Sequence, residues 1–312
     1  MRMNIGHSMP LQIALLILFA VLIQAGCRQR VLTPTRPPSF NQEHAYTLLK
    51  DVCNLGPRNH GSASKLQAEK WIQDKLREAG AEVSVHEFTY TTKESRTLET
   101  FRNIMGRIRP LEPRRVMVGT HYDTRSWADR DPRPELRATP IIGANDGASG
   151  VAVMLEMARA WKDDPPPVGV DLFFFDGEDF GRKSTVEDNL IGSSAWVKDH
   201  PGYKPEWGVV IDMVGDSSLR IPKDKASAAR ACKAVRQIWS AAERLGSPAF
   251  ADGFSRHIYD DNTAFIDRGI PVALLIDFEY SWFHTTEDLP DKCSAESLGQ
   301  VGRTVMEAIY GT

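Results

Sequence analysis

VGVDLFFF at residues 168–175, followed by DGED at 176–179, is a near-continuous apolar run that ends in acidic residues. A run of this kind predicts a strand that is buried on both faces of a sheet. VVIDMV at residues 209–214 has the same character, with Asp212 inside the apolar run. Two such strands predict a largely parallel sheet, because strands of parallel sheets are covered by helices on both sides and lose the polar alternation of half-exposed strands.

Segments on either side of these strands complete the predicted architecture. Helices are expected where apolar residues recur every three or four positions, and strands where apolar residues cluster between turn signals. The alternation of the two predicts an α/β fold, with an open, mixed, mostly parallel twisted sheet, helices on both faces and a single domain at residues 40–312. The expected helices are 62–79, 147–161, 225–245 and 294–310, and the further expected strands are 81–90, 101–108, 115–119 and 271–276.

Composition and charge narrow the class of function. The 312 residues are 42% hydrophobic and 25% charged, the balance of a soluble globular protein. The 38 basic and 41 acidic residues give a formal charge of −3, which argues against nucleic acid as a partner. The cysteines at 27, 53, 232 and 293 form no CxxC pair, so a cysteine zinc finger and a dense disulfide framework are not expected. Cys53, Cys232 and Cys293 are expected to be buried thiols.

The N-terminus has the features of an export signal. Residues 13–23, IALLILFAVLI, are apolar and follow Arg2, and the run is shorter than the roughly 20 residues that span a membrane. AGC at 25–27 resembles the lipobox of bacterial lipoproteins, in which the cysteine is acylated and becomes the first mature residue. Gln24 departs from that motif, which usually has leucine there. Ordinary cleavage after Ala25 and a buried core helix are the competing interpretations.

We therefore predict a signal peptide at residues 1–26 and a tether at 27–39. The tether contains three prolines and three arginines, and proline favours an extended chain because it fixes φ and removes a hydrogen-bond donor. The protein is expected to be exported. It would then be either a lipoprotein, held to a membrane only through Cys27, or a secreted protein.

Side chains that can bind a metal gather where the predicted strands end. In open α/β sheets, ligands bind beyond the carboxyl ends of the strands. Imidazoles and carboxylates without thiolates suit a zinc site of the catalytic kind, which keeps a position open for water or substrate. The candidates are His121, Asp123, Asp146, Glu178, Asp179, Asp212, Asp260, Asp261 and His284.

Each of these signals alone has a plainer explanation. The HxD motif at 121–123 is more often a turn than a ligand pair, and Asp146 could cap the helix that follows it. The acid pair at 178–179 could lie in a solvated loop, and His284 could be a satisfied core histidine. Asp212 is harder to dismiss, because a buried carboxylate needs either a cationic side chain or a metal. The order of the motifs along the chain makes the set specific.

Taken in that order, the motifs resemble metallopeptidase family 28, which comprises zinc aminopeptidases and their relatives, the glutaminyl cyclases. The resemblance runs from about residue 48 to residue 310, and it implies the three-layer fold of the zinc aminopeptidases. The segments that carry it are GTHYDTR at 119–125, GANDGASGVAVMLEMARA at 143–160, FFFDGEDFG at 173–181, GSSAW at 192–196, VVIDMVGD at 209–216, YDDNTAFIDRGIPVALLI at 259–276 and HTTEDLPDKCSAESL at 284–298.

The resemblance also implies roles for individual residues. Asp146, Asp179 and His284 match the zinc ligands of the cyclases, and Glu178 matches their general acid/base. His121 and Asp212 match ligands of a second metal in the di-zinc aminopeptidases. In those enzymes the residue that corresponds to Asp146 bridges the two zinc ions. All five of these positions are filled, so the number of ligands does not decide between one zinc ion and two. One Zn²⁺ is expected, with two as the alternative.

Three features favour the cyclase branch of the resemblance. The DGED pattern at 176–179 resembles the acid/base segment of cyclases, and Asp260 matches an extra active-site Asp that aminopeptidases typically lack. Aromatic residues crowd the chain before the ligand histidine and are expected to form the substrate pocket; they are Tyr280, Trp282 and Phe283. Animal cyclases differ in having Trp where Phe283 stands, and Trp in the loop occupied here by RKS at 182–184.

The expected function is that of a zinc-dependent glutaminyl-peptide cyclotransferase, which converts an N-terminal Gln to pyroglutamate with release of ammonia. Glu178 would move the proton, and Asp260 and Asp212 would orient that transfer. The alternatives are a zinc aminopeptidase of the same family and a non-catalytic peptide-binding lipoprotein on the same fold. The expected partners are the N-termini of peptides or proteins, and we expect a monomer.

Overall fold

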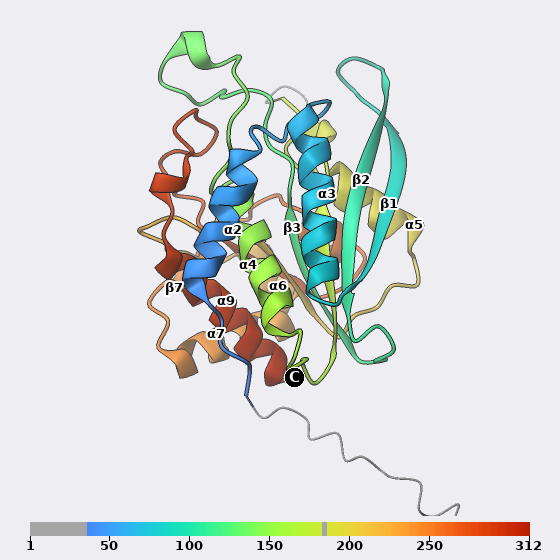
Figure 1. Ribbon diagram of the computed structural model, residues 1–312, viewed down its shortest axis with the longest axis vertical. Helices are drawn as coiled ribbons and strands as arrows, with labels where there is room; N and C mark the ends of the chain where they lie inside the picture. The colour runs from blue at the N-terminus through green and yellow to red at the C-terminus, as the bar shows by residue number, and fades with distance from the viewer. Residues whose placement is uncertain (1–35, 183–185) are drawn as a thin grey trace, which may run out of the picture. The chain divides into compact units, whose positions relative to one another are not determined.

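The computed structural model describes residues 36–182 and 186–312 (Figure 1). The predicted signal peptide, Cys27 and most of the tether lie outside the described residues. The helices are α2 (Gln42–Asn54), α3 (Ala63–Glu78), α4 (Ala148–Ala160), α5 (Ile191–Asp199), α6 (Lys225–Arg230), α7 (Cys232–Leu245), α8 (Asn262–Ile266) and α9 (Ala295–Tyr310), with short 3-10 turns η1 (Pro134–Leu136), η2 (Val186–Asp188) and η3 (Pro290–Lys292). The strands are β1 (Glu82–Thr91), β2 (Leu98–Ile108), β3 (Arg115–His121), β4 (Gly169–Phe175), β5 (Gly208–Asp212), β6 (Ile221–Lys223), β7 (Phe250–Phe254) and β8 (Val272–Ile276).

The main sheet has the strand order β1-β2-β4-β3-β5-β8. β4, β3, β5 and β8 run parallel to one another, while β2 is antiparallel to β4 and β1 is antiparallel to β2. Every residue of β4, β5 and β8 is buried, as the apolar runs at 168–175 and 209–214 predict. The predicted mixed, mostly parallel sheet is confirmed.

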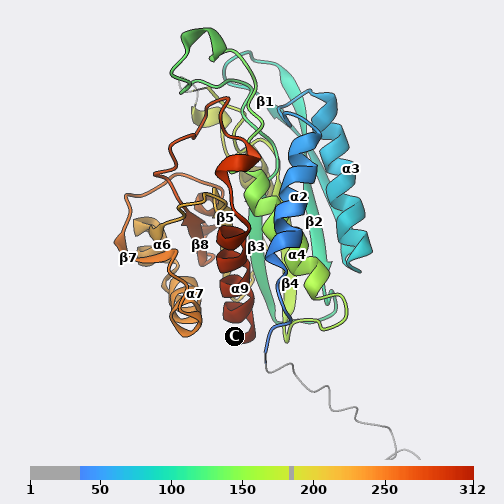
Figure 2. The same cartoon turned by 60° about the vertical axis from the view of Figure 1, so that its left-hand side comes forward.

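Helices cover both faces of this sheet. α2, α3, α4, α7 and α9 contribute to an apolar cluster on one face, and the two views of the ribbon show α2, α4 and α9 side by side there (Figures 1 and 2). α5 and α8 cover the other face, where Trp196 and Phe265 meet aromatic side chains of β4. The ring centroids of Trp196 and Phe173 are 4.9 Å apart, and those of Phe265 and Phe175 are 5.9 Å apart. The result is the predicted three-layer arrangement.

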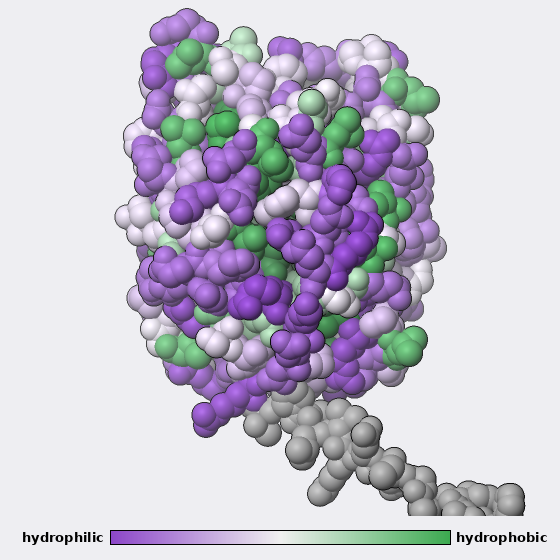
Figure 3. All heavy atoms as spheres, viewed as in Figure 1, coloured by the Kyte–Doolittle hydropathy of each residue, from purple (hydrophilic) through white to green (hydrophobic). Residues whose placement is uncertain are grey.

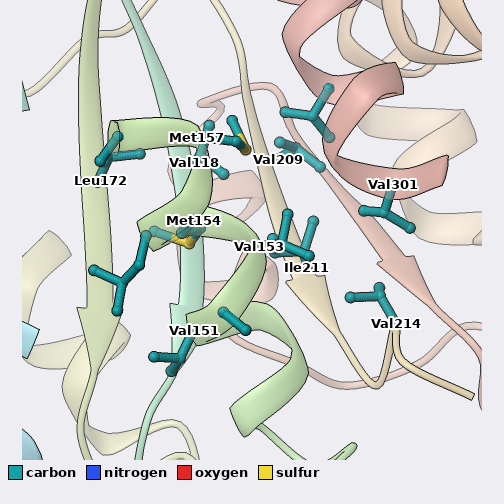
Figure 4. Close-up of a cluster of buried hydrophobic side chains, with 14 of the residues drawn as sticks. Val118, Val151, Val153, Met154, Met157, Leu172, Val209, Ile211, Val214 and Val301 are labelled. Carbon is teal, nitrogen blue, oxygen red and sulfur yellow. The ribbon is translucent and has the colours of Figure 1, made fainter. Parts of the chain in front are cut away.

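The core between α4 and the sheet shows how this packing is built (Figure 4). Met154 of α4 lies against strands that present Val118, Leu172 and Ile211, and Val301 of α9 packs beside them. All five side chains are fully buried. Burial of a side chain of this size contributes about 1.5–3 kcal/mol, so α4 is held to the sheet mainly by its apolar face.

The helix ends follow their sequence signals. The Ser62 side chain accepts a hydrogen bond from the Lys65 amide at the start of α3, as its place before the predicted helix suggests. Gly246 ends α7 in the left-handed conformation with φ of 61°, which glycine adopts without steric cost. Asp146 does not cap α4: Gly147 occupies the N-cap position, and no side chain caps that helix.

Three local expectations were wrong. The helix expected at 225–245 is two helices that meet at Ala231, where φ is −126° and ψ is 36°. The Ser227 hydroxyl of α6 accepts a hydrogen bond from the Leu274 amide of β8. Both helices contact β8, but α7 packs mainly against α9. The strand expected at 209–214 ends at Asp212, because Met213 turns to a φ of 44°. Cys232 is exposed at the start of α7 and is not a buried thiol.

Several elements were not anticipated from the sequence. They include α2 and α5, and a second, two-stranded parallel sheet of β6 and β7 beyond the β8 edge (Figure 2). The molecular face over α2, α4 and α9 is mostly hydrophilic, with apolar residues scattered over it (Figure 3). Among the described residues, none of the helices combines the length and the apolar character needed to cross a lipid bilayer.

Candidate metal centre

Strand topology brings the candidate residues to one end of the sheet. β4 lies on one side of β3 and β5 on the other, so the chain reverses its direction of winding between them. Such a switch point leaves a crevice beyond the carboxyl ends of the strands. His121 is the last residue of β3 and Asp212 the last of β5, and the acid pair at 178–179 follows β4.

One group of ligand atoms is formed by His121, Asp146 and Asp212, all buried. His121 Nε2 lies 3.1 Å from Asp146 Oδ1 and 3.1 Å from Asp212 Oδ1. On the other side of the ring, His121 Nδ1 lies 3.2 Å from the carbonyl oxygen of Asp123. A carbonyl oxygen can only accept, so Nδ1 carries a proton and Nε2 is the atom that turns to the two carboxylates.

A second group is formed by Asp146, Asp179 and His284. His284 Nε2 lies 3.5 Å from Asp146 Oδ2 and 3.4 Å from Asp179 Oδ2. Asp146 therefore offers one oxygen to each group and connects them. Asp146 Oδ2 and Asp179 Oδ2 are buried and accept no hydrogen bond from the residues that the structure describes.

These residues fit a divalent metal. A buried carboxylate oxygen without a partner is costly, and a cation removes that cost. Zn²⁺ binds imidazole nitrogen and carboxylate oxygen at about 2.0–2.2 Å, so two ligand atoms of a tetrahedral site lie about 3.4 Å apart. The separations of 3.1–3.5 Å between the imidazole nitrogens and carboxylate oxygens are of that size. The unpaired oxygens at 146 and 179 point to the second group as the better equipped one.

Other residues hold the ligands in place. Arg125 Nη1 donates to Asp179 Oδ1 at 2.6 Å, and its other nitrogens donate to Asp129 at 3.0 and 3.1 Å. Asp129 Oδ1 in turn lies 3.3 Å from His284 Nδ1, so the His284 ring has a carboxylate behind it and presents Nε2 to the ligand group. Asp288 accepts hydrogen bonds from the Asp146 amide at 3.2 Å and from the Asn145 amide at 2.8 Å.

Sequence reasoning missed Arg125, Asp129 and Asp288 as supporting residues. Their signal was weak but present: Arg125 and Asp129 are four residues apart just after the HxD motif, and Asp288 lies four residues after His284. Four candidates from the sequence are in neither ligand group: Asp123, Glu178, Asp260 and Asp261. Asp123 accepts from the amides of residues 178 and 179 at 3.3 and 3.2 Å, so it holds the acid pair in place. Asp261 is buried, and its amide donates to Asp260 Oδ1 at 2.6 Å.

A cavity of about 370 Å³, the site cavity, opens over the ligand groups. Glu178, Asp212 and Asp260 lie on its wall together with the ligands 146, 179 and 284. The three acids expected to handle protons therefore share one hollow with the candidate metal site. Its less polar side is formed by Met213, Ile258, Tyr259, Ile276, Phe278 and Phe283.

The predicted aromatic wall needs correction. Phe283 lines the site cavity, but Tyr280 and Trp282 are not among the described residues that do so. Tyr280 is buried and donates its hydroxyl hydrogen bond to Asp288 Oδ1 at 2.8 Å, which turns it away from the cavity. Trp282 is 40% exposed, with the Lys292 ammonium 5.0 Å from its ring centroid. Phe278, which sequence reasoning missed, takes a place beside Phe283 with ring centroids 5.3 Å apart.

The electrostatic setting favours protonated carboxyl groups at the cavity. Burial raises the pKa of Glu178 well above its usual range, and Asp179 and Asp260 add to this effect while His121 opposes it. Burial also raises the pKa of Asp260 strongly, with Asp212 as the next cause. A raised pKa makes a carboxylate a stronger base, which favours its use in general acid/base catalysis.

Burial lowers the pKa of a histidine, but the pKa values of both His121 and His284 are raised by the carboxylates around them. Burial lowers the pKa of His284, yet Asp179 and Asp129 outweigh it and bring the value to about 9. Burial likewise opposes the rise at His121, where Asp212, Asp123 and Asp146 carry the pKa well above its usual range. Without a metal, the two histidines would thus be protonated and would share protons with the neighbouring carboxylates. A divalent cation would take the place of these protons.

Known proteins share this chain's sequence pattern and fold. The sequence model of peptidase family M28 matches residues 103–309. The glutaminyl-peptide cyclotransferase of Bothrops jararaca is 26% identical over 90% of this chain and 83% of its own length. The structure of Bacteroides thetaiotaomicron glutaminyl cyclase superposes with a TM-score of 0.85 at 32% identity, over 89% of this chain and 100% of that one. A Zn-dependent exopeptidase from Parabacteroides distasonis superposes with a TM-score of 0.85 at 33% identity, over 88% of this chain and 99% of that one. Cyclases and exopeptidases are thus equally similar in fold.

Proposed function

The chain belongs to peptidase family M28, and from this premise we propose that it is a zinc-dependent glutaminyl-peptide cyclotransferase. The observation that carries the proposal is Asp260, a buried carboxyl group on the wall of the site cavity that also holds Glu178. Its position matches the extra active-site acid by which cyclases differ from aminopeptidases. The cyclases among the similar proteins support the same choice.

Asp146, Asp179 and His284 would hold one Zn²⁺, and His121 and Asp212 could complete a second site with Asp146 shared. When bound, the zinc ion polarises the γ-amide carbonyl of the substrate glutamine as a Lewis acid. Arg125 donates hydrogen bonds to the ligand Asp179 and to Asp129, which lies behind the His284 ring, and so helps to hold both ligands in place.

Glu178 would carry the proton in this reaction. The α-amine nitrogen forms a bond to the γ-amide carbon, the bond from that carbon to the amide nitrogen breaks, and ammonia leaves. Glu178 takes a proton from the attacking amine and delivers it to the leaving nitrogen, which its raised pKa favours. Asp260 and Asp212, on the same wall, would hold the amine and the amide by hydrogen bonds. Phe283 and Ile258 would exclude water, whose attack would give glutamate in place of pyroglutamate.

The second candidate is a zinc aminopeptidase. The observation that favours it is the complete group of His121, Asp146 and Asp212, which supplies ligands for a second metal beside the first. The exopeptidase fold neighbour is as similar as the cyclase. In this reaction Glu178 would take a proton from water and the first peptide bond would be hydrolysed. A non-catalytic peptide-binding protein is the third candidate.

Product analysis separates these functions. The protein from residue 28 onward is incubated with zinc and Gln-Ala-Ala-amide, and products are followed by mass spectrometry and an ammonia assay. A loss of 17 Da with intact peptide bonds, above the rate in buffer alone, is expected for the cyclase. Ala-Gln-Ala-amide serves as the control because its Gln is not N-terminal. Release of free Gln or Ala would refute the cyclase, and binding without either product would indicate the third candidate.

The metal count and the setting of the protein have their own tests. We propose one zinc per chain, which elemental analysis of the dialysed protein measures directly. We also propose that the segment at 1–26 directs export and that Cys27 anchors the protein to a membrane. The proposed substrates are peptide N-termini, and the proposed oligomeric state is a monomer. Metabolic labelling with a fatty acid, compared between the wild type and Cys27→Ala, tests the anchor, and unlabelled wild-type protein would contradict it.

A further inference from the structure

A second hollow of about 680 Å³ opens next to the site cavity. Its wall includes three arginines, Arg130, Arg220 and Arg256, and we call it the arginine groove. Arg130, Ile258 and Phe278 line both the groove and the site cavity, so the two hollows adjoin at these side chains. The groove lies where the end of β7 and the segment after it pass the chain that follows β8, beyond that edge of the sheet (Figure 2).

The guanidinium groups of this groove differ from most others in the described part of the chain. Arg130, Arg220 and Arg256 are exposed, and none of them forms a salt bridge with a described residue. By contrast, exposed arginines such as Arg114 and Arg244 pair with nearby carboxylates at 2.8 and 3.0 Å. Three unpaired guanidinium groups around one hollow therefore offer a set of free hydrogen-bond donors.

Aromatic rings orient two of these arginines. The Arg256 guanidinium lies 4.4 Å from the centroid of the Phe278 ring, and that of Arg130 lies 4.5 Å from the Phe283 centroid. A guanidinium stacked on a ring keeps its N–H groups at the edge, where they can bind a carboxylate through two parallel hydrogen bonds. The stacking also costs the side chain rotational freedom before any ligand arrives, so less entropy is lost on binding.

Two acidic residues also line the groove, and their negative charges offset part of the positive charge of the arginines. Asp252 and Glu279 line it, and neither forms a salt bridge with Arg130, Arg220 or Arg256 within the described residues. Three positive charges against two negative ones leave the groove positive, next to a site cavity whose wall is rich in carboxylates. Arg125 also lines the site cavity, but carboxylates outnumber arginines there, whereas arginines outnumber carboxylates in the groove.

From this arrangement we propose that the arginine groove binds a carboxylate carried by residues two to four of the substrate peptide. The carboxylate could belong to an Asp or Glu side chain or to the C-terminus of a short peptide. The inference rests on the proposed function, in which the first residue sits in the site cavity at Glu178. An extended chain advances about 3.3–3.6 Å per residue, so residues two to four can reach the groove along the shared wall. Exposed Tyr259 and Phe254, on the walls of the cavity and the groove, offer aromatic surface beside that path.

Steady-state kinetics on matched peptides test the proposal. Gln-Glu-Ala-Ala-amide, Gln-Ala-Glu-Ala-amide and Gln-Ala-Ala-Glu-amide are each compared with the peptide that has Gln in place of Glu. The acidic peptide is expected to have a kcat/KM roughly fivefold to tenfold higher at one or more positions, mostly through a lower KM. This is the gain expected from one bidentate hydrogen-bonded pair between an arginine and a carboxylate. The gain should shrink as the salt concentration rises. Gln-Ala-Ala-Ala with a free and an amidated C-terminus shows whether a terminal carboxylate produces the same gain.

The double variant Arg220→Gln, Arg256→Gln identifies the groove as the source. It should reduce the acidic-to-neutral ratio of kcat/KM to about one while leaving turnover of Gln-Ala-Ala-amide unchanged. Arg236→Gln is the matched control, because Arg236 is an exposed arginine on α7 that lines a different hollow. Equal kcat/KM for acidic and neutral peptides in the wild type, or an acidic preference that survives in the double variant, would overturn the proposal.

A binding measurement keeps this test separate from the proposed function. If neutral Gln peptides are cyclised without any acidic preference, the groove proposal fails and the proposed function stands. If no peptide is cyclised, the proposed function fails, and calorimetry with Gln-Ala-Glu-Ala-amide and its neutral counterpart decides the groove. Tighter binding of the acidic peptide to the wild type, lost in the double variant, would support the groove. Equal affinities would overturn it.

Discussion

Buried acids lie at two places in the central sheet, within a strand and beyond the strand ends, and the two places differ in what surrounds the acids. Asp171, in the middle of β4, accepts from Arg115 with 3.0 Å to each oxygen, from Arg107 at 3.3 Å and from the Tyr203 hydroxyl at 3.0 Å. Both of its oxygens have partners. Beyond the carboxyl ends of the same sheet, Asp146 and Asp179 each keep one buried oxygen that accepts no hydrogen bond from the described residues.

The difference separates a structural acid from acids built for a ligand. The cluster around Asp171 is complete within the protein, so its removal should cost stability alone. The group at Asp146 and Asp179 is complete only with a bound cation, so its removal should cost metal binding and turnover. Asp176 lies on the chain between the two and is intermediate. Its Oδ2 accepts from Lys65 at 2.8 Å and from the Arg102 amide at 2.7 Å, while its Oδ1 has no partner among the described residues.

The largest effect is expected from Glu178→Gln. An amide cannot take up the proton of the attacking amine, so kcat should fall by about 10²–10⁴-fold. Glu178 belongs to neither ligand group, so zinc per chain should not change. The measurement is kcat with Gln-Ala-Ala-amide together with elemental analysis, and Glu135→Gln, an exposed acid on η1, is the control. A fully active variant would show that another group moves the proton.

Arg115→Ala should break the complete cluster without touching the metal. It leaves the buried Asp171 carboxylate short of its main partner, and the free energy of unfolding should fall by about 3–5 kcal/mol. Zinc content and KM should stay at wild-type values. Arg114→Ala is the matched control, because Arg114 is 54% exposed in its pair with Glu206 and should cost less than about 1 kcal/mol. Denaturant unfolding measures both variants, and equal losses would contradict the distinction.

Asp146→Asn should remove the response of stability to metal. Zinc that binds only the folded wild type raises its free energy of unfolding by about 2.7 kcal/mol when free zinc is about 100 times its Kd. The variant loses the carboxylate shared by both ligand groups, so zinc should no longer raise its Tm. Without zinc it should be no less stable than the wild type, because burial raises the pKa of Asp146 and so disfavours its charged form. Asp163→Asn is the exposed control, and a variant that kept the zinc-dependent rise in Tm would contradict the shared ligand.

The smallest effect concerns the pH dependence of the zinc-free protein. Burial raises the pKa of Asp176 from 3.8 to about 6, against the opposing effect of Lys65. The folded state therefore binds more protons than the unfolded state between these values, and this group's contribution to stability falls as the pH rises from about 4 to about 6. The slope should be at most about 1.4 kcal/mol per pH unit. Asp176→Asn should flatten the profile by that amount relative to the wild type, whereas Asp51→Asn, an exposed acid on α2, should not. Parallel profiles for the wild type and Asp176→Asn would refute the shift.

Much of the fold could be predicted because its signals are local. The buried strands β4, β5 and β8 are recognisable as apolar runs, and helix ends are marked by residues such as Ser62 and Gly246. The break at Ala231 could not be predicted, because it accompanies tertiary contacts that the local sequence does not show: α6 is bonded to β8, and α7 packs mainly against α9. The small sheet of β6 and β7 has strands of only three and five residues, too short for a periodic pattern to stand out.

The candidate site was predicted less evenly. The motifs place acids and histidines after strands, so their meeting at one end of a parallel sheet follows from topology. The aromatic wall does not follow, since neighbours in sequence point in different directions: Phe283 lines the cavity, while Trp282 lies outside it. Arg130 and Arg256 could not be assigned to the site at all, because more than a hundred residues of chain separate two side chains that line one groove.

The clearest limit is set by two acids that look alike in the sequence. Asp171 and Asp212 both lie inside apolar strands, and the cost of burying a charge requires a partner for each. The sequence by itself determined that need, along with the layered α/β fold and the order of the motifs. Only the tertiary structure decided the partners, placing Arg115 beside Asp171 and His121 beside Asp212. Partner choice depends on strand register and on which neighbouring strand supplies the side chain, and neither is encoded within a single strand.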